Sequence, residues 1–156
     1  MTELSRLDNI DRSILRILQN RADASVRDIA LEVGLSQTPC WRRIKRLSQA
    51  GIIDKGVTLL NQEMLGFGVT VIVELKLKQQ DEASIAAFEQ AVLPIENIME
   101  CYSIAGEKDF MLIVVAESVA AYDRLMKTRL VKLPGVDTIN SRIALSRVKY
   151  STKLPV

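Results

Sequence analysis

Hydrophobic residues recur at helical spacing through the first fifty positions of the chain. We expect a first helix over about residues 8–19, because apolar side chains there fall on one face and charged ones on the other. That apolar stripe consists of Leu7, Ile10, Ile14, Ile17 and Leu18. Second and third helices are expected over 26–33 and 37–50, and each is followed by a glycine, Gly34 or Gly51, that suits a helix end. Three short helices joined by tight turns are typical of a helix–turn–helix domain.

The period of the pattern changes to two from residue 69, which predicts strands. Expected strands cover 69–78, 98–105, 110–116 and 136–149, and expected helices cover 81–92 and 119–131. The order β-α-β-β-α-β predicts a ferredoxin-like fold, in which both helices cover one face of an antiparallel sheet. The segment 110–116 is almost wholly apolar, as expected of a central strand that is covered on both faces.

These two patterns divide an α+β protein into two domains, at 1–60 and 61–156. The β-branched residues around Gly56 predict an extended wing or linker strand over 52–60, so we expect the first domain to be a winged helix–turn–helix. The second face of the sheet in the other domain also carries apolar residues. A second copy of the chain is the simplest cover for them, and we therefore expect a dimer through the sheets.

The positive charge of the chain is concentrated in its first domain. Residues 1–60 hold ten Lys and Arg against seven Asp and Glu, a net charge of +3, whereas residues 61–156 hold eleven against twelve, a net charge of −1. This asymmetry favours nucleic acid as a partner of the first domain. The sequence has no histidine and only two cysteines, so it lacks the usual zinc ligands and the commonest general base. We expect no metal, no cofactor and no disulfide framework.

Several other classes of protein are not expected. No apolar run approaches the roughly 20 residues that a membrane-spanning helix needs. Residues 1–6 lack the apolar core of a signal peptide, so we expect a cytoplasmic, nucleoid-associated protein without a membrane partner. An enzyme on the second domain would have to use Glu100, Glu107 and Asp109 as its acids, and no nucleophile–base pair supports it.

Four basic residues within five positions mark the third expected helix as the one that contacts DNA. The inward stripe of this helix on a helical wheel is Cys40, Ile44 and Leu47. The candidate DNA contacts are Ser36, Gln37, Thr38, Arg42, Arg43, Lys45, Arg46 and Gln49. We assign Arg42 and Arg46 to base edges, because a guanidinium can bridge O6 and N7 of guanine, and Lys45 to phosphate. Arg43 suits either role. The alternative is a charge run that only solvates an exposed helix face.

Trp41 lies at the border of the inward stripe of the same helix. We expect its ring to pack against the first or second helix, with a phosphate or sugar contact as the alternative. Cys40 and Cys101 are both expected to be small buried hydrophobic residues.

Four ordered groups of residues carry a resemblance to a known family across nearly the whole chain. They are Leu7-Asp8-x-x-Asp11-x-x-Ile14-Leu15-x-x-Leu18-Gln19, then Ala30-x-x-Val33-Gly34-Leu35-Ser36-x-Thr38-Pro39-Cys40-x-x-Arg43-Ile44-x-Arg46-Leu47, then Gly106-x-x-Asp109-Phe110-x-Leu112, and Leu133-Pro134-Gly135-Val136. This set resembles the Lrp/AsnC (feast/famine) family of transcription regulators. The resemblance implies an N-terminal DNA-binding domain, a C-terminal RAM-type domain that binds small effectors, usually amino acids, and dimers that assemble into octamers or related rings.

The resemblance also implies an effector site near the turn at 106–109, close to contacts between dimers. The candidate effector residues are Tyr102, Ser103, Gly106, Glu107, Lys108, Asp109, Val119, Arg142, Ile143 and Ala144. Backbone N–H groups of a Gly-containing turn can hold an α-carboxylate, and the Asp109 carboxylate can accept from an α-ammonium. Tyr102 and Ser103 would then line the side-chain end of the site. The alternative is that Gly106 and Asp109 only form a tight hairpin.

The sequence as a whole therefore predicts a homo-oligomeric, sequence-specific DNA-binding transcription regulator that responds to a small effector. Its expected partners are double-stranded DNA, an amino acid and further copies of the chain. A nucleoid-organising protein that needs no effector is the remaining alternative outside catalysis.

Overall fold

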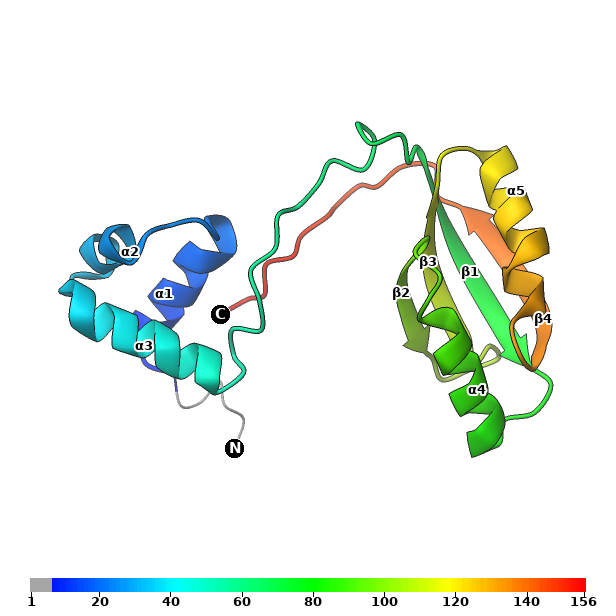
Figure 1. The fold of residues 1–156 in the computed structure, drawn as a ribbon, viewed down its shortest axis with the longest axis horizontal. Helices are drawn as coiled ribbons and strands as arrows, with labels where there is room; N and C mark the ends of the chain where they lie inside the picture. Colours follow the sequence, from blue (N-terminus) through cyan, green and yellow to red (C-terminus); the bar gives the residue numbers. More distant parts are fainter. Residues whose placement is uncertain (1–6) are drawn as a thin grey trace. The chain divides into compact units, whose positions relative to one another are not determined.

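The computed structural model describes residues 7–156 of the chain, which form two compact units (Figure 1). The first unit comprises the described residues up to Leu59 together with Lys149–Val156, and the second comprises Leu60–Val148. The sequence division assigned all of 61–156 to the second domain. That assignment is wrong for the last of these residues, because Lys149–Val156 packs with the helices of the first unit.

Three helices make up the first unit: α1 at Asn9–Asn20, α2 at Val26–Val33 and α3 at Gln37–Gln49. Helix α1 begins with a capping box, in which the side chains of Asp8 and Asp11 each accept from the backbone N–H of the other residue. Between α2 and α3, Gly34 adopts a φ of 71°, a left-handed conformation that favours glycine and ends α2. The three helices expected from the sequence are confirmed to within one residue at their ends.

The core of the first unit draws on all three helices and on the tail of the chain. Its buried residues are Ile14, Leu15, Ile29, Ala30, Cys40 and Leu47. Val156 packs against this core, and the side-chain amide of Gln19 bonds both backbone groups of Leu154. The N–H of Leu154 donates to Oε1 at 2.6 Å, and Nε2 donates to the Leu154 carbonyl at 3.2 Å. Nε of Arg16 donates to the Val156 carbonyl at 2.8 Å. The tail is therefore held by hydrogen bonds to α1 as well as by apolar contact.

The wing or linker strand expected over 52–60 does not form. The structure assigns no strand there, and Ile52 and Ile53 donate their backbone N–H groups to the carbonyl of Leu47 at the end of α3. A strand needs a partner edge for its backbone groups. The first unit offers no other strand among its described residues, so 52–60 stays extended without pairing.

The second unit is a four-stranded antiparallel sheet with helices. Its elements are β1 at Val69–Leu77, α4 at Glu82–Val92, β2 at Ile98–Ser103, β3 at Phe110–Ala116, α5 at Val119–Thr128, the 3-10 turn η2 at Leu130–Lys132 and β4 at Val136–Ile143. The strand order is β2-β3-β1-β4, so the first and third strands are central. This is the ferredoxin-like arrangement that the element order predicted.

One face of this sheet carries the core of the second unit. Val71, Val73 and Leu75 of β1 are fully buried in one cluster with Phe88 of α4 and Tyr122 of α5. Both helices therefore cover the same face, as expected. The opposite face is left open within one chain.

Strand β4 ends at Ile143, short of the expected 149. Its partner β1 supplies the reason, because Ile143 pairs with Val71 and the N–H of Ala144 makes the last bond, to the carbonyl of Thr70 at 2.9 Å. Beyond Ala144 no residue of β1 remains to accept a ladder bond. No helix in the described part of the chain is both long enough and apolar enough to cross a bilayer.

Candidate nucleic-acid interface and effector pocket

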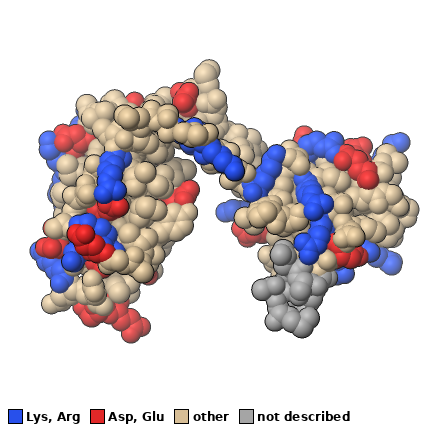
Figure 2. Space-filling model, turned by 180° about the vertical axis from the view of Figure 1, so that it is seen from behind, with Lys and Arg blue, Asp and Glu red and all other residues tan. Residues whose placement is uncertain are grey.

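Helix α3 presents one continuous exposed face. Cys40 and Leu47 are buried and Ile44 packs against the core of the first unit, so the inward stripe is confirmed. The exposed positions of the helix are Gln37, Thr38, Pro39, Trp41, Arg42, Lys45, Arg46, Ser48 and Gln49. Figure 2 shows blue Lys and Arg side chains in several patches on the unit at the right, interrupted by red carboxylates. A helix exposed along its length and rich in cations has the shape and charge to enter the major groove of DNA.

Two of the four cations on α3 are ion-paired with aspartates of the first helix. Nη1 of Arg43 lies 2.6 Å from Oδ2 of Asp8 and 2.9 Å from Oδ1 of Asp11. Nη2 of Arg46 lies 2.5 Å from Oδ2 of Asp11. We call these four residues the α1–α3 clamp. Asp11 is its centre, because its side chain is only 1% exposed and accepts from both arginines.

The clamp gives its arginines partners within the first unit that the sequence did not suggest. Arg46 had been assigned to a base edge, and Arg43 to a base or a phosphate. In the structure their charges are balanced by Asp8 and Asp11, two cations against two carboxylates. The helical wheel placed Arg46 correctly on the surface, since its side chain is 59% exposed, but the long side chain reaches back to α1.

The electrostatics of the clamp favour its charged form. The backbone N–H of Asp11 and the guanidinium of Arg43 both hold the pKa of the Asp8 carboxyl below its usual value of 3.8. Hydrogen bonds to Asp8 and Asp11 in turn raise the pKa of Arg43. The pair Arg43–Asp8 lies at the surface, so its Coulomb energy is screened by water.

Arg42 and Lys45 carry the remaining charge of α3. Arg42 forms no ion pair or hydrogen bond with any residue in the part of the chain that the structure describes. A shallow hollow beside it is lined by Pro39, Arg42, Arg43 and Arg46. Nζ of Lys45 lies 4.9 Å from the centre of the Trp41 ring, a cation–π contact.

Trp41 is more exposed than the expected packing of its ring against α1 or α2 implies. Its side chain is 49% exposed and contributes nothing to the core of the unit. Position 41 follows the buried Cys40 by one residue, about 100° around the helix, which places it on the outer face. Cys101 also departs from expectation, since it is exposed. Ser36 precedes α3 as its N-cap, but its side chain makes no capping hydrogen bond.

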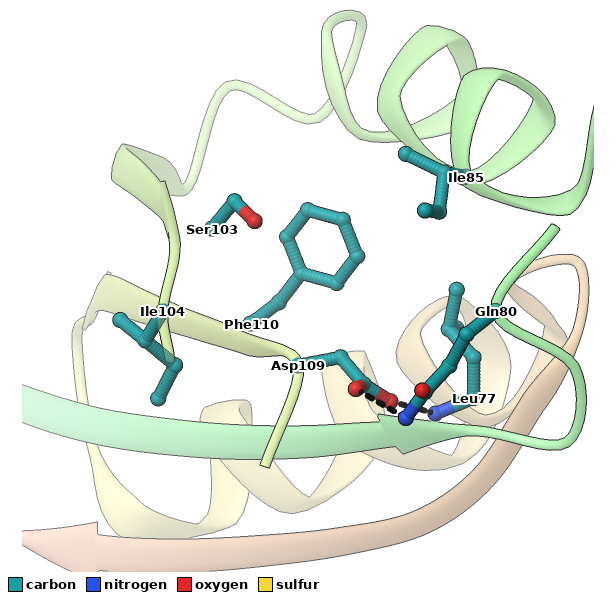
Figure 3. A pocket seen from close by; sticks show the side chains of 7 residues that line it. All are labelled: Leu77, Gln80, Ile85, Ser103, Ile104, Asp109 and Phe110. Atoms are coloured by element: carbon teal, nitrogen blue, oxygen red, sulfur yellow. Dashed lines mark hydrogen bonds between the residues drawn. The ribbon is translucent and has the colours of Figure 1, made fainter. Parts of the chain in front are cut away.

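A pocket of about 270 Å³ lies in the second unit, where β1, β2 and β3 meet α4 (Figure 3). Its lining residues are Leu77, Gln80, Ile85, Ser103, Ile104, Asp109 and Phe110. Figure 3 shows the Phe110 ring in the middle and the Asp109 carboxylate pointing toward the end of β1. Oδ2 of Asp109 accepts from the Leu77 N–H and Oδ1 accepts from Nε2 of Gln80, both at 2.7 Å. Asp109 is thus the only charged side chain of this lining, which combines four apolar side chains with the polar Gln80 and Ser103.

The structure brings only two of the ten predicted effector residues into this pocket, Ser103 and Asp109. Gly106, Glu107 and Lys108 form the turn that leads to Asp109, and the Ile104 N–H closes this turn on the Asp109 carbonyl at 2.9 Å. Tyr102 faces the other side of the sheet, because it pairs with Met111, which in turn pairs with Glu74 on the open face.

Val119 and Arg142-Ile143-Ala144 are not near the pocket within one chain. The pocket lies where β1 ends at Leu77, whereas Ile143 pairs with Val71 near the start of β1. Val119 begins α5 just after β3, whose last residue Ala116 pairs with Val69. The prediction that these residues lie beside the turn at 106–109 is therefore wrong for a single protomer, because antiparallel pairing sends them to the far end of the sheet.

Five pocket residues were missed by the sequence reasoning: Leu77, Gln80, Ile85, Ile104 and Phe110. Leu77, Ile85 and Phe110 read as ordinary core positions. Gln80 stands in a short polar connection with no motif around it. The position of Gln80 beside the end of β2 follows only from the strand pairing, so no pattern in the sequence could have predicted it.

A helix–turn–helix unit with a cationic outer helix and a ferredoxin-like unit with its own pocket define a DNA-binding regulator with a separate ligand-binding domain. Comparison with known families agrees on both parts. The family model for the Lrp/AsnC ligand binding domain matches residues 70–154, and a model for winged helix-turn-helix DNA-binding domains matches residues 7–54.

Individual relatives match over almost the whole chain. The DNA-binding transcriptional activator DecR of Escherichia coli K12 is 33% identical over 150 residues, which cover 96% of this chain and 99% of DecR. The leucine-responsive regulatory protein of the same strain is 35% identical over 150 residues, with 96% and 92% covered. A solved AsnC family transcriptional regulator from Agrobacterium tumefaciens matches with a TM-score of 0.91 at 36% identity, covering 96% of this chain and 97% of that one.

A transcriptional regulator from Neisseria meningitidis, solved in complex with L-Met, also matches with a TM-score of 0.91. It is 27% identical, and 96% of each chain is covered. The chain belongs to the Lrp/AsnC family, and it is a DNA-binding transcription regulator of that type. The family consists of regulators and not of enzymes, which answers the catalytic alternative raised by the acidic residues of the second unit.

Proposed function

We propose that α3 lies in the major groove of DNA and reads sequence through Arg42. The supporting observation is that Arg42 is the one arginine of the basic run without a partner among the described residues, on the exposed face of α3. A guanidinium without an internal partner can form two hydrogen bonds to guanine. Ser36, Gln37, Thr38 and Gln49 flank it and are assigned to phosphate and base edges. Lys45 is assigned to phosphate, and the clamp arginines hold the helix to α1.

Replacing Arg42 by alanine is expected to weaken binding at a selected DNA site by about 1–3 kcal/mol and to relax the preference for guanine there. The reason is the loss of two hydrogen bonds to one base edge. The measurement is a mobility-shift titration on duplexes that wild-type protein has selected from a random library. Arg129→Ala, which removes the same charge from the second unit, is the control. If Arg42→Ala binds the selected duplexes as tightly as wild type does, and the random duplexes equally too, Arg42 does not read a base.

We further propose that the open face of the sheet is the dimer interface. Ile72 of β1 pairs with Ile113 of β3, and Met111 lies two pairs further along on the same face, so an apolar strip crosses the two central strands. Beside it the ion pair Glu74–Arg142, at 3.0 Å, adds polar contacts at the edge. A strip of this kind suits association with a second copy of itself. The dimer would place two α3 helices on successive turns of the major groove, about 34 Å apart.

The pocket of the second unit is the proposed effector site, and the effector class is an amino acid with an apolar side chain. Asp109 keeps lone pairs beyond its two internal bonds and can accept from an α-ammonium. Ile85, Ile104 and Phe110 offer apolar surface to the ligand side chain. The Neisseria relative solved with L-Met supports a ligand of this chemistry. Residues 142–144 and Val119 would reach an effector only from a neighbouring protomer in a larger assembly.

Titration calorimetry with a panel of amino acids tests this site. We expect heats with L-Met and L-Leu, and none with L-Asp or L-Lys. Asp109→Asn is expected to weaken binding roughly 10-fold to 150-fold, because it removes a charge-assisted bond of about 1.5–3 kcal/mol while its amide oxygen can still accept from Leu77. Glu107→Gln removes the same charge from an exposed side chain of the same turn and should bind as wild type. Equal heats for Asp109→Asn and wild type would exclude Asp109 from the site.

A further inference from the structure

Trp41 is the most conspicuous residue that the proposed function has not used. It is the only tryptophan of the sequence, and it stands half exposed on the helix proposed to enter the groove. Helix α3 contributes Cys40, Ile44 and Leu47 to the core of the first unit, and Trp41 does not belong to that core. An indole is costly to leave in water, because it presents a large apolar area. Such a side chain on a binding surface is typical of a contact residue.

The neighbours of Trp41 hold its ring on the outer face. Thr38, Trp41 and Lys45 are spaced by three and four residues, so they form one stripe along α3. The ammonium of Lys45 lies over the ring at 4.9 Å, and a cation–π contact of this kind restricts the rotation of both side chains. Arg42, the proposed guanine reader, follows directly in sequence. The ring therefore lies against the Lys45 ammonium and is adjacent in sequence to the proposed guanine reader.

The chemistry of the major groove limits what this ring can contact. Phosphate oxygens and the polar base edges offer hydrogen-bond acceptors and donors, which arginine, lysine and the hydroxyl side chains satisfy better than an indole. Among the base edges of the major groove, the C5-methyl group of thymine is the largest apolar group and the one that identifies a base. Contact between the ring and this methyl removes apolar area from water on both sides.

We propose that Trp41 is a specificity residue that recognises thymine through its C5-methyl group, next to the base read by Arg42. This rests on the proposed entry of α3 into the major groove. Lys45 acts here as a positioning residue for the ring as well as a phosphate contact. The expected recognition sequence therefore holds a thymine within one or two base pairs of the guanine in each half-site.

Replacement of thymine by deoxyuridine tests this contact, because it removes only the methyl group. Duplexes selected by wild-type protein from a random library are resynthesised with one deoxyuridine at a time, and binding is measured by mobility shift. At one position in each half-site, wild-type affinity should fall about 3-fold to 10-fold, a loss typical of a buried methyl group. Trp41→Ala should bind the thymine and deoxyuridine duplexes equally. Trp41→Phe, which keeps a smaller ring, should retain part of the difference.

Leu31→Ala provides the matched control. Leu31 is an apolar residue of α2 in the same unit, 71% exposed, and its variant should keep the full wild-type response to deoxyuridine. Circular dichroism of each variant confirms the fold. The intrinsic fluorescence of wild type adds a second readout, because binding to the selected duplex should protect Trp41 from quenching by acrylamide.

Two outcomes distinguish failure of the thymine contact from failure of the proposed DNA recognition by α3. If wild type and Trp41→Ala lose the same factor at every thymine, or if acrylamide quenches Trp41 equally with and without DNA, the thymine contact is wrong while DNA binding stands. If wild-type protein selects no sequence from the library, the proposed reading of DNA by α3 fails as well.

Discussion

Replacing Asp11 by alanine is expected to lower the free energy of unfolding of the first unit by about 1.5–3 kcal/mol, the range for a hydrogen bond between charged groups. Asp11 is 1% exposed, and it joins Arg43 and Arg46 of α3 to α1. Without it the two guanidinium groups lose a shared acceptor. Neither arginine is left buried without a partner, because Arg43 keeps Asp8 and the largely exposed Arg46 can be hydrated.

Urea unfolding followed by the fluorescence of Trp41 measures this effect, since the single tryptophan lies in the first unit and reports on it alone. Asp23→Ala removes the same charge from an exposed position of the same unit and should leave the midpoint unchanged. Asp11→Asn keeps the shape and one acceptor, so we expect an intermediate loss. Identical midpoints for Asp11→Ala and Asp23→Ala would show that the clamp contributes nothing to stability.

Replacing Ile113 by lysine is expected to convert the proposed dimer into monomers and to weaken binding to a two-half-site duplex on the order of 10²–10⁴-fold, the usual gain from linking two binding modules. The new ammonium would have to be buried against the second protomer without water. Within one chain it can instead approach Glu100, the residue that pairs with Ile113 across β2 and β3. The fold of the monomer should therefore survive the change.

Sedimentation velocity and mobility shift on the same samples check this result. Val131→Lys serves as the control, because Val131 is a 49% exposed apolar residue of η2 in the same unit. It should sediment and bind DNA as wild type. If Ile113→Lys sediments as the same dimer as wild type, the interface lies elsewhere and the open face of the sheet does not have its proposed role.

The hydrophobic periodicity of the sequence and the glycines that end its helices were enough to predict most of the fold. Gly34 and Gly51 mark the ends of α2 and α3 because each stands at a φ of 71°, where other residues are strained. Alternation from Val69 predicts β1, since its odd positions from Val71 onward are buried and its even ones are not. The strand at 52–60 and the extension of β4 to 149 failed for one reason. Local propensity favours an extended chain, but pairing depends on whether a partner strand reaches that far.

The candidate sites were harder to predict, because side chains reach across elements. The helical wheel gives the direction of Arg46 but not the position of α1, whose Asp11 takes up that charge. The signal was present in part, as Asp8 and Asp11 stand one turn apart at the start of a helix with an apolar stripe. In the second unit Asp109 was recognised, whereas Gln80 was not. Gln80 lies in the pocket because the chain turns there after β1, and no sequence motif predicts that turn.

The docked tail has a consequence for how the protein is made. Residues 7–59 are synthesised before the second unit, yet Leu154 and Val156, which bond to Gln19 and Arg16 of α1, are synthesised after it. The helical unit can thus begin to fold first, but its contacts with the tail form last. Nascent chains arrested before the tail emerges should hold a looser set of helices than the released polypeptide.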